Sequence, residues 1–403
     1  MFNRRIYLDY ASLTPIDKRV MKEMKKYSSS AYANASSWYR EGVAAKNALD
    51  AARKNVAGFL RAHQDEVTFT SGGTEGNNMA MIGSIEHLHE QGIEYEKMHV
   101  IISAIEHSSV RECANYLNDK GVIVDVVPVK QDGIVDLDAL KQKIRPNTAL
   151  VSIMTVNNEI GTVQPIREIA KVIRHAHTKI KSGVESTPSA DGFNFQSEIK
   201  YPLFHTDAAQ GLYEDLNVER LGVDFLTLDG SKLYGPRGIG ALYHKKNIPL
   251  TPLLYGGGQE NGLRSGTENI PAIMGFSKAL ELVNATRESE ERRIAELRKY
   301  FIARLKSLDN SITVNGNTAD SSPHILNVSI PGIDSEFFVL QLDAKGIACS
   351  TKSSCLRDND ESYVLKAIGA NSKNSVRFSF GRGTSIWNLA KTIRVIGKLI
   401  ESR

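Results

Sequence analysis

The sequence predicts an α/β protein in which helices cover both faces of a mostly parallel sheet. Between about residues 47 and 243, continuous apolar runs alternate with amphipathic segments. This alternation is typical of strands that are buried on both faces and connected by helices. After the glycine-rich residues 256–269, the pattern changes to a long helix followed by short strands and helices. We therefore expect a large domain with a mostly parallel seven-stranded sheet and a smaller α+β domain.

The expected elements follow from the apolar runs and from the periodicity between them. Strands of the large domain are expected over residues 66–70, 99–103, 122–129, 149–156, 203–207, 224–228 and 238–244. The smaller domain is expected to contain a helix over 273–308, strands over 325–330 and 375–380, and helices from Ser335 and at the carboxyl terminus. We assign residues 17–263 to the large domain, and residues 1–16 and 264–403 to the small one. Residues 178–201 are rich in serine, glycine, proline and charge, and we expect a surface insertion there.

Composition argues against several classes of function. A net charge of +4 over 403 residues gives no argument for nucleic-acid or anionic-membrane binding. No apolar run is long enough to span a bilayer, and the first ten residues lack the apolar segment of a secretory signal. The 3 cysteines are too few for a disulfide framework, and no C-x-x-C zinc half-site is present. We expect a cytoplasmic protein with no metal site.

Polar residues follow the expected strands at their carboxyl ends, where the loops of open α/β sheets bind ligands. Gly73 and Thr74 stand at a helix start, which suits either a phosphate or an ordinary helix cap. Lys232 lies in a turn of small residues between two apolar strands. It is either a solvated loop residue or an amine that forms a Schiff base with a carbonyl cofactor. The same kind of position, after other strands, is occupied by His107, Asn158 and Asp207.

Several longer sequence motifs, spread over nearly the whole chain, help to decide between these roles. They are YLDYASLTP, TSGGTEGNN, EHSSV, VSIMTVNNEIGTVQ, HTDAAQ, KLYGPRGIGALY, GGGQENGLRSGTEN, SYVLKAIG and SVRFSFGR. With these strings the chain resembles the cysteine desulfurases of the NifS/IscS type, in the class V aminotransferase group of fold-type I pyridoxal-phosphate enzymes. The resemblance implies the fold-type I transferase fold and the conversion of L-cysteine to L-alanine. It also implies that sulfur passes as a persulfide to an acceptor protein, such as an iron–sulfur scaffold or a tRNA-thiolation enzyme.

The resemblance implies a set of contacts to pyridoxal 5′-phosphate. Lys232 falls on the lysine that forms the Schiff base, and Asp207 falls on the carboxylate that faces the pyridine nitrogen and keeps the ring an electron sink. His107 falls on the imidazole stacked over the ring, which suits proton transfer near neutral pH. The other cofactor positions fall on Gly73, Thr74, Asn158, Gln210, Ser231 and, supplied by the second subunit of a homodimer, Thr267.

The substrate side of the site is implied in the same way. Asn158 and Arg377 fall on positions that engage the substrate, with Arg377 as a fork for its carboxylate. Asn34 matches a substrate-side asparagine, although the later histidine of that motif is Tyr39 here.

The catalytic cysteine of the family falls on Cys355, within the polar segment STKSSCLRDND. Its thiolate would attack the sulfur of the bound substrate, so a polar loop serves this role better than a buried position. The other cysteines, Cys113 and Cys349, stand in a helical and an apolar context, and we expect both to be small core residues.

Two short strings depart from the family pattern. The family usually has Ser-x-His before the lysine, whereas this chain has Asp229-Gly230-Ser231. A carboxylate about 4 Å from a phosphate would cost about 4 kcal/mol at an effective dielectric near 20, or roughly a thousandfold in affinity. The cysteine string also differs, because KSSC at residues 352–355 replaces the common Gly-Ser-Ala-Cys.

These departures leave two alternatives to a desulfurase. One is a selenocysteine lyase, or another class V lyase or transaminase, with the same cofactor. The other is a degenerate homologue that binds partners without catalysis. The joint presence of Lys232, Asp207, His107, Arg377 and Cys355 favours an active desulfurase, because a site without chemistry has no reason to keep them all.

Overall fold

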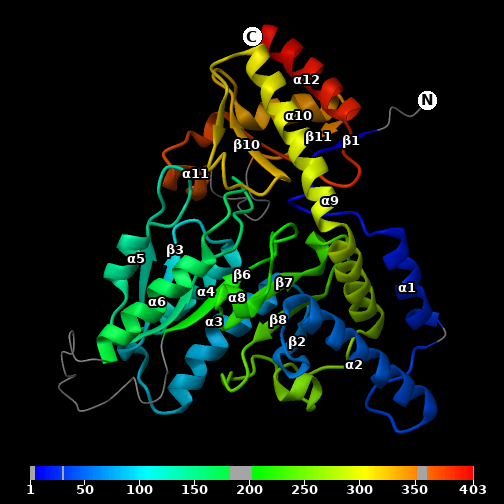
Figure 1. Cartoon of the computed structure of the whole chain (residues 1–403), viewed down its shortest axis with the longest axis vertical. Coiled ribbons are helices and arrows are strands. Elements are labelled where there is room, and N and C mark those ends of the chain that lie inside the picture. The colour runs from blue at the N-terminus through cyan, green and yellow to red at the C-terminus, as the bar shows by residue number, and fades with distance from the viewer. Residues whose placement is uncertain (1–4, 30, 182–201, 352–360, 403) are drawn as a thin grey trace.

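The computed structural model describes residues 5–29, 31–181, 202–351 and 361–402, and a seven-stranded sheet lies at the centre of its larger half (Figure 1). The strands are β2 (Val67–Thr70), β3 (His99–Ser103), β4 (Ile123–Val127), β5 (Thr148–Ser152), β6 (Leu203–Asp207), β7 (Phe225–Asp229) and β8 (Gly240–His244). Their order across the sheet is β2-β8-β7-β6-β5-β3-β4. Strands β4, β3, β5, β6 and β7 pair in parallel, and β8 is antiparallel to both of its neighbours. The expected mostly parallel sheet is confirmed.

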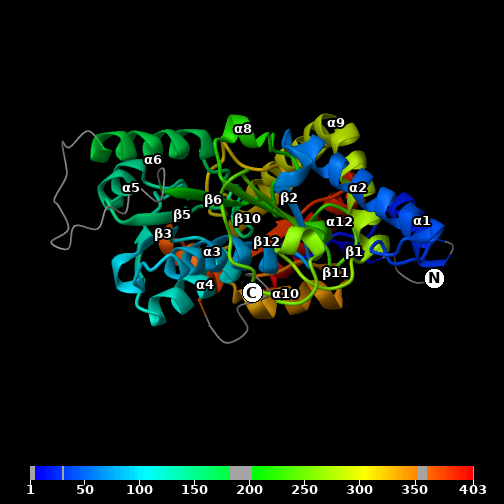
Figure 2. The same ribbon diagram turned by 90° about the horizontal axis from the view of Figure 1, so that it is seen from below.

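Helices cover both faces of this sheet (Figure 2). One face carries α3 (Gly73–Glu90) and α4 (Ser108–Asp119), and the other carries α5 (Leu137–Lys143), α6 (Ile166–Lys181) and α8 (Val218–Leu221). Neighbouring residues of β3 divide between the two cores: Val100 and Ile102 pack with the residues of α3 and α4, whereas Ile101 packs with those of α6 and α8. The sheet is therefore buried on both sides, as its continuous apolar strands predict.

The smaller half of the molecule is built on a three-stranded antiparallel sheet with the order β12-β10-β9. Its elements are β9 (Thr313–Asn315), β10 (Ile325–Ser329), α10 (Ser335–Ala344), α11 (Tyr363–Ala367), β12 (Ser375–Ser379) and α12 (Ile386–Glu401). The amino-terminal β1 (Ile6–Tyr7) pairs with β11 (Ile347–Ala348). This pairing places residues 6–7 in the smaller half, and the domain bounds stay a prediction.

A single long helix, α9 (Ile270–Leu308), runs from the large half into the small half (Figure 1). Its first part packs against α1 (Lys18–Ser29) and α2 (Arg40–Leu60), and it also contacts α12. Asn269 caps its amino end by accepting a hydrogen bond from the backbone N–H of Ala272. Short 3₁₀ helices complete the fold: η1 (Gln64–Glu66), η2 (Tyr95–Lys97), η3 (Gly230–Lys232), η4 (Gln259–Gly262) and η5 (Ser372–Asn374).

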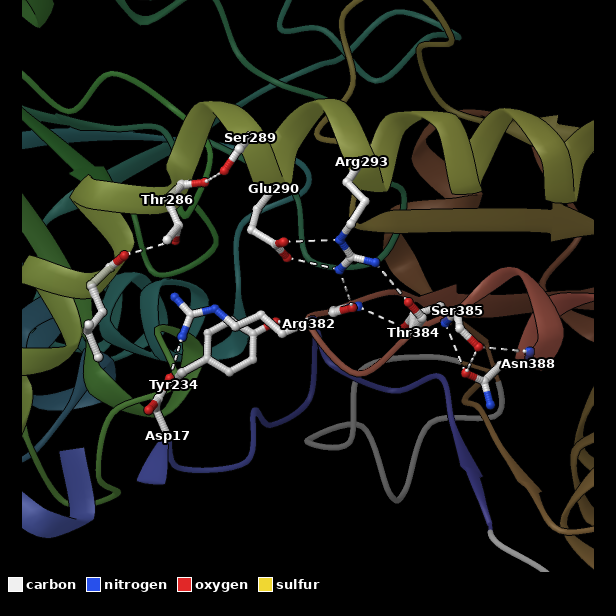
Figure 3. A network of polar contacts seen from close by, with 12 residues as sticks. Asp17, Tyr234, Thr286, Ser289, Glu290, Arg293, Arg382, Thr384, Ser385 and Asn388 are labelled. Atoms are coloured by element: carbon white, nitrogen blue, oxygen red, sulfur yellow. Dashed lines mark hydrogen bonds and ion pairs between the residues drawn. The ribbon is translucent and has the colours of Figure 1, made fainter. Parts of the chain in front are cut away.

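Polar contacts join the two halves beside η3 (Figure 3). The guanidinium of Arg382, which follows β12, lies 4.2 Å from the ring centroid of Tyr234 and 2.9 Å from Asp17 Oδ2. In the same network Arg293 of α9 pairs with Glu290 and donates to the carbonyl of Thr384. The turn before α12 is thereby held against both α9 and the segment that follows η3.

The structure corrects one expectation at the edge of the insertion. Residues 178–181 continue α6 to Lys181 instead of starting an insertion, while residues 182–201 lie outside the described residues. Two lysines in this stretch are good helix formers. Among the described helices, none has the length and apolar composition to cross a membrane.

Candidate active site

A cavity of about 240 Å³ lies where the parallel strands end. The loops that follow β2, β3 and β5 and the ends of β6 and β7 each contribute to its lining. Of the residues predicted from the sequence, the cavity brings together Gly73, Thr74, His107, Asn158, Asp207, Gln210, Lys232 and Arg377.

Three predicted site residues are not among those that line the cavity, and a fourth lies outside the described residues. Asn34 and Thr267 are exposed and do not line this cavity. The carboxamide oxygen of Asn34 accepts a hydrogen bond from the N–H of Ser36 at 2.8 Å. Ser231 neighbours the cavity but bonds to Asp229. Cys355 lies outside the described residues, so its role and those of Asn34 and Thr267 stay predictions.

Lys232 ends η3, and the amino-terminal segment braces this turn. The Lys232 ammonium donates to the carbonyl of Ser12 at 2.5 Å. Thr14 Oγ1 donates to the carbonyl of Ser231 at 2.8 Å and accepts from the N–H of Tyr234 at 2.8 Å. Tyr234 has a φ of 60°, which is uncommon for a residue other than glycine. The lysine is therefore presented by a turn that residues more than 200 positions away hold in place.

Asp207 ends β6 and is buried, with 5% of its surface exposed. Its Oδ1 accepts from the N–H of Ala209 at 2.9 Å, and its Oδ2 accepts from the Asn77 carboxamide at 2.8 Å. The two donors fix the orientation of the carboxylate at the cavity wall. Asn77 Oδ1 is buried with no hydrogen-bond partner among the described residues.

His107 caps α4, and its ring is held by a chain of hydrogen bonds that leads to Asp207. The ring Nδ1 accepts from the N–H of Ser109 at 3.2 Å and lies 2.9 Å from Ser109 Oγ. Asn77 donates to that same Oγ at 2.8 Å and to Asp207. Because a backbone N–H donates to Nδ1, this nitrogen carries no hydrogen in the neutral ring, and the ring proton belongs on Nε2. Asn77 and Ser109 are not among the residues predicted from the sequence, because both resemble ordinary polar residues of a helix.

Glu106, directly before His107, is fully buried. Burial raises the pKa of Glu106 to about 8, and the nearby charge of Asp207 adds to this effect. Ser103 Oγ and the N–H of Met154 both donate to its Oε1. The side chain is therefore a neutral acid at pH 7. Nothing in the sequence separates it from a surface glutamate in a loop.

Arg377 of β12 is 1% exposed and already engages three oxygen atoms. It donates to the Asn158 carbonyl at 2.8 Å, to Asp9 Oδ1 at 2.9 Å and to Ser12 Oγ at 2.7 Å. Its Nε is buried without a hydrogen-bond partner in the part of the chain that the structure describes. A buried N–H of this kind is costly unless another group binds it.

Gln210 is oriented by neighbours on both sides of its carboxamide. Its Nε2 donates to the carbonyl of Ala11 at 2.8 Å, and its Oε1 lies 3.2 Å from His324 Nε2. Burial lowers the pKa of His324 to about 3, so this imidazole is neutral and donates to the carboxamide oxygen. One hydrogen of the Gln210 Nε2 amide is used by Ala11, and the amide has a second.

The amino end of α3 approaches β7 closely. A Cβ on Gly76 would lie 2.7 Å from Thr227 Cγ2, so only glycine allows this packing. Gly72, just before α3, has a φ of 149°, which side-chain-bearing residues rarely adopt. These glycines bring the first N–H groups of α3 to the cavity, and Asp229 Oδ2 accepts from the N–H of Gly73 at 3.2 Å.

The donor set fits an aldehyde cofactor with a basic ring. The cavity combines an amine (Lys232), a buried and doubly bonded carboxylate (Asp207), an imidazole with its proton on Nε2 (His107) and the amino end of a helix (Gly73). These groups match the aldehyde, the pyridine nitrogen, the ring face and the phosphate of pyridoxal phosphate. At the phosphate end, the carboxylate of Asp229 crowds the same space. Among the described residues, no cluster of side chains suits a metal ion.

Comparison with known proteins agrees with this chemistry. The family model "Aminotransferase class-V" matches residues 6–182 and 195–389. "Cysteine desulfurase IscS" of Dictyoglomus turgidum is 37% identical over 99% of this chain and 95% of its own length. "Cysteine desulfurase IscS 1" of Archaeoglobus fulgidus is 35% identical over 98% of this chain and 97% of its own length.

Solved structures of similar proteins share this fold. A structure described as "NIFS-LIKE PROTEIN" superposes with a TM-score of 0.86 at 29% identity, covering 99% of this chain and 100% of its own. A structure described as "SspA in complex with cysteine" superposes with a TM-score of 0.75 at 33% identity, covering 93% of this chain and 98% of its own. The fold-type I assignment is thereby confirmed.

Proposed function

Because this chain belongs to the class V aminotransferase family and is a cysteine desulfurase, we propose that its cavity binds pyridoxal 5′-phosphate and L-cysteine, and that sulfur leaves as a persulfide on Cys355. One observation carries the proposal: a single cavity combines Lys232, Asp207, His107 and Arg377. Each supplies a chemical group that the reaction requires. When bound, pyridoxal phosphate supplies an aldehyde that condenses with amines and a ring that withdraws electrons from the attached amino acid.

The chain's own residues divide the remaining work. Lys232 anchors the cofactor through its amine, and Asp207 binds the ring nitrogen in an orientation set by Asn77 and Ala209. His107 covers the ring and moves protons through Nε2, because its Nδ1 is bound by Ser109. Gln210 donates its second amide hydrogen to the ring oxygen.

Arg377 binds the carboxylate of L-cysteine. Its Nε–H has no partner among the described residues, and its two terminal amino groups already bond to the Asn158 carbonyl, Asp9 and Ser12. A substrate carboxylate at Nε satisfies this buried donor with a charge-assisted hydrogen bond. Asn158, whose carbonyl also holds Arg377, lies at the same wall of the cavity.

The sulfur-transfer step conserves atoms and electrons. The thiolate of Cys355 attacks the sulfur of the bound substrate, so that one S–S bond forms and one C–S bond breaks. The electron pair of the C–S bond stays with the carbon fragment, which takes up a proton and leaves as L-alanine. The sum is L-cysteine plus a protein thiol giving L-alanine plus a protein persulfide. An acceptor protein in turn removes the sulfur from Cys355.

Turnover of L-cysteine tests this assignment. The protein with added pyridoxal phosphate is expected to form L-alanine, and mass spectrometry is expected to find one extra sulfur on the peptide that contains Cys355. Cys355→Ala should lose both products, whereas Cys113→Ala, which removes a buried thiol elsewhere, should keep both. Equal alanine formation by Cys355→Ala and the parent would refute the persulfide route.

A further inference from the structure

The carboxylate of Asp229 bonds to the first N–H of α3. Its Oδ2 accepts from Gly73 N at 3.2 Å. Its Oδ1 accepts from the N–H of Ser231 at 2.8 Å and from the Ser231 hydroxyl at 2.6 Å. Asp229 thus links the amino end of α3 to the turn that carries Lys232.

The same helix end is the anion-binding position of the cavity. The first N–H groups of a helix lack intrahelical partners and lie at the positive end of its dipole. Gly73, Thr74 and Asp229 all line the cavity there. The protein's own carboxylate therefore already occupies part of the position that suits a phosphate.

Among the described residues, Asp229 forms hydrogen bonds to Gly73 and Ser231 but no ion pair. The other acid of the first turn, Glu75, accepts from the N–H of Ser71 at 2.6 Å and pairs with Arg264 at 2.9 Å. Of the cavity-lining cations, Lys232 donates to the Ser12 carbonyl, and Arg377 is bound by Asp9. A phosphate at Gly73 would meet a carboxylate at hydrogen-bond distance from the same donor.

We propose that Asp229 is a specificity residue that weakens the hold of this site on the phosphate group of its cofactor. The inference rests on the proposed binding of pyridoxal phosphate. The carboxylate competes with the phosphate for the Gly73 N–H and repels its charge. The phosphate then adds less to cofactor affinity than it would in a site without this carboxylate.

Two substitutions separate the charge of Asp229 from its structural role. Asp229→Asn keeps an oxygen that accepts from Ser231 and removes the negative charge. Asp229→Ser also removes the charge and leaves more room for a phosphate. Asp215→Asn is the matched control, because it removes one negative charge from an exposed ion pair with Arg220 that does not line the cavity.

The test is titration of each apoprotein with pyridoxal 5′-phosphate and, separately, with pyridoxal, which lacks the phosphate. Absorbance and protein fluorescence give both dissociation constants. We expect Asp229→Asn and Asp229→Ser to bind pyridoxal phosphate tighter by roughly tenfold to a thousandfold. Affinity for pyridoxal should change by less than about threefold, and Asp215→Asn should match the parent with both ligands.

The ratio of the two affinities decides the test, because a loss of folded protein would lower the apparent affinity for both ligands equally. An unchanged ratio in both Asp229 variants would overturn the inference while leaving the proposed function intact. Failure of the parent and every variant to bind either aldehyde would instead overturn the proposed function, and this inference with it.

Discussion

The orientation of the His107 ring depends on two residues that the sequence pattern does not identify. Ser109 bonds to its Nδ1 twice, and Asn77 connects Ser109 to Asp207. The imidazole and the carboxylate are thereby set by one shared hydrogen-bond chain. The relative orientation of the imidazole and the carboxylate therefore depends on the whole hydrogen-bond network and not on either residue alone.

Ser109→Ala should therefore impair proton transfer by His107 without preventing the binding of pyridoxal phosphate. The ring would keep only the backbone donor to Nδ1, and we expect alanine formation to fall about tenfold, a fraction of the full effect of a general acid or base. The pH profile of kcat/KM should shift while affinity for pyridoxal phosphate stays near that of the parent. Ser108→Ala, one residue earlier, is the control. If Ser109→Ala left the rate and the pH profile unchanged, the hydrogen bond from Ser109 would have no role in proton transfer by His107.

Glu106 provides a second prediction at this scale. Its pKa rises from 4.5 in the unfolded chain to about 8 in the folded protein, so the folded state binds the proton more tightly. The free energy of unfolding must then decrease as pH rises from about 4.5 through about 8. Glu106→Gln, which keeps the acceptor for Ser103 and Met154, should lack this decrease. Melting temperatures at about pH 6 and about pH 9 measure it, and parallel curves for the two proteins would exclude a neutral Glu106.

Cavity residues with distinctive chemistry could be predicted from the sequence, whereas the residues that orient them could not. Lys232, Asp207 and His107 were recognised because they follow strands within long family strings, and all three line the cavity. The sequence also showed that Asp229 departs from the family pattern, but it could not show whether this carboxylate points toward the cavity. Asn77 and Glu106 gave no signal, because their roles depend on burial and on partners distant in the chain.

At the scale of elements, the strands were predicted closely because buried parallel strands are short apolar runs. Residues 99–103 and 203–207 match β3 and β6 at both ends. The strand expected over 149–156 is shorter in the structure, where β5 covers Thr148–Ser152. Its buried continuation still bonds to β6 at Ile153 and Thr155, but it bends toward Asn158 and the cavity. Apolar composition alone does not distinguish a strand from a buried loop.

The contact between Arg382 and Tyr234 fastens β12, which carries Arg377, to the turn that carries Lys232 (Figure 3). We expect Arg382→Ala to lower the free energy of unfolding by about 1–3 kcal/mol, through a lost cation–π contact and a partly buried ion pair. Denaturant unfolding measures this change.

Arg19→Ala is the matched control, because Arg19 pairs with the same Asp17 at 2.7 Å but is 57% exposed. Its loss should cost less than about 0.5 kcal/mol. Equal destabilisation by the two substitutions would show that the aromatic contact contributes nothing.

At the scale of the whole molecule, we predict that Thr267 contacts the phosphate in the site of a second copy of the chain. Thr267 is exposed and outside its own cavity, so its predicted phosphate contact requires a homodimer. Sedimentation should find a dimer. Thr267→Ala and Lys232→Ala, each weak or inactive alone, should regain activity when mixed under conditions that exchange subunits, because one intact composite site then forms. Active monomers, or no recovery on mixing, would contradict this arrangement.

The layered architecture could be predicted from the sequence because alternation of strands and helices leaves few topologies. The joining of the two halves could not be predicted, because it depends on single contacts such as Lys232 with Ser12 and Gln210 with Ala11. These contacts bring the amino terminus into the cavity wall from a distant part of the chain.

The attachment of pyridoxal phosphate to Lys232 can be measured directly. The protein is incubated with pyridoxal 5′-phosphate, reduced with borohydride and digested, and the labelled peptide is identified by mass spectrometry. We expect a single stable adduct on Lys232, which should be absent from Lys232→Ala. An adduct confined to other lysines, or no adduct at all, would contradict it.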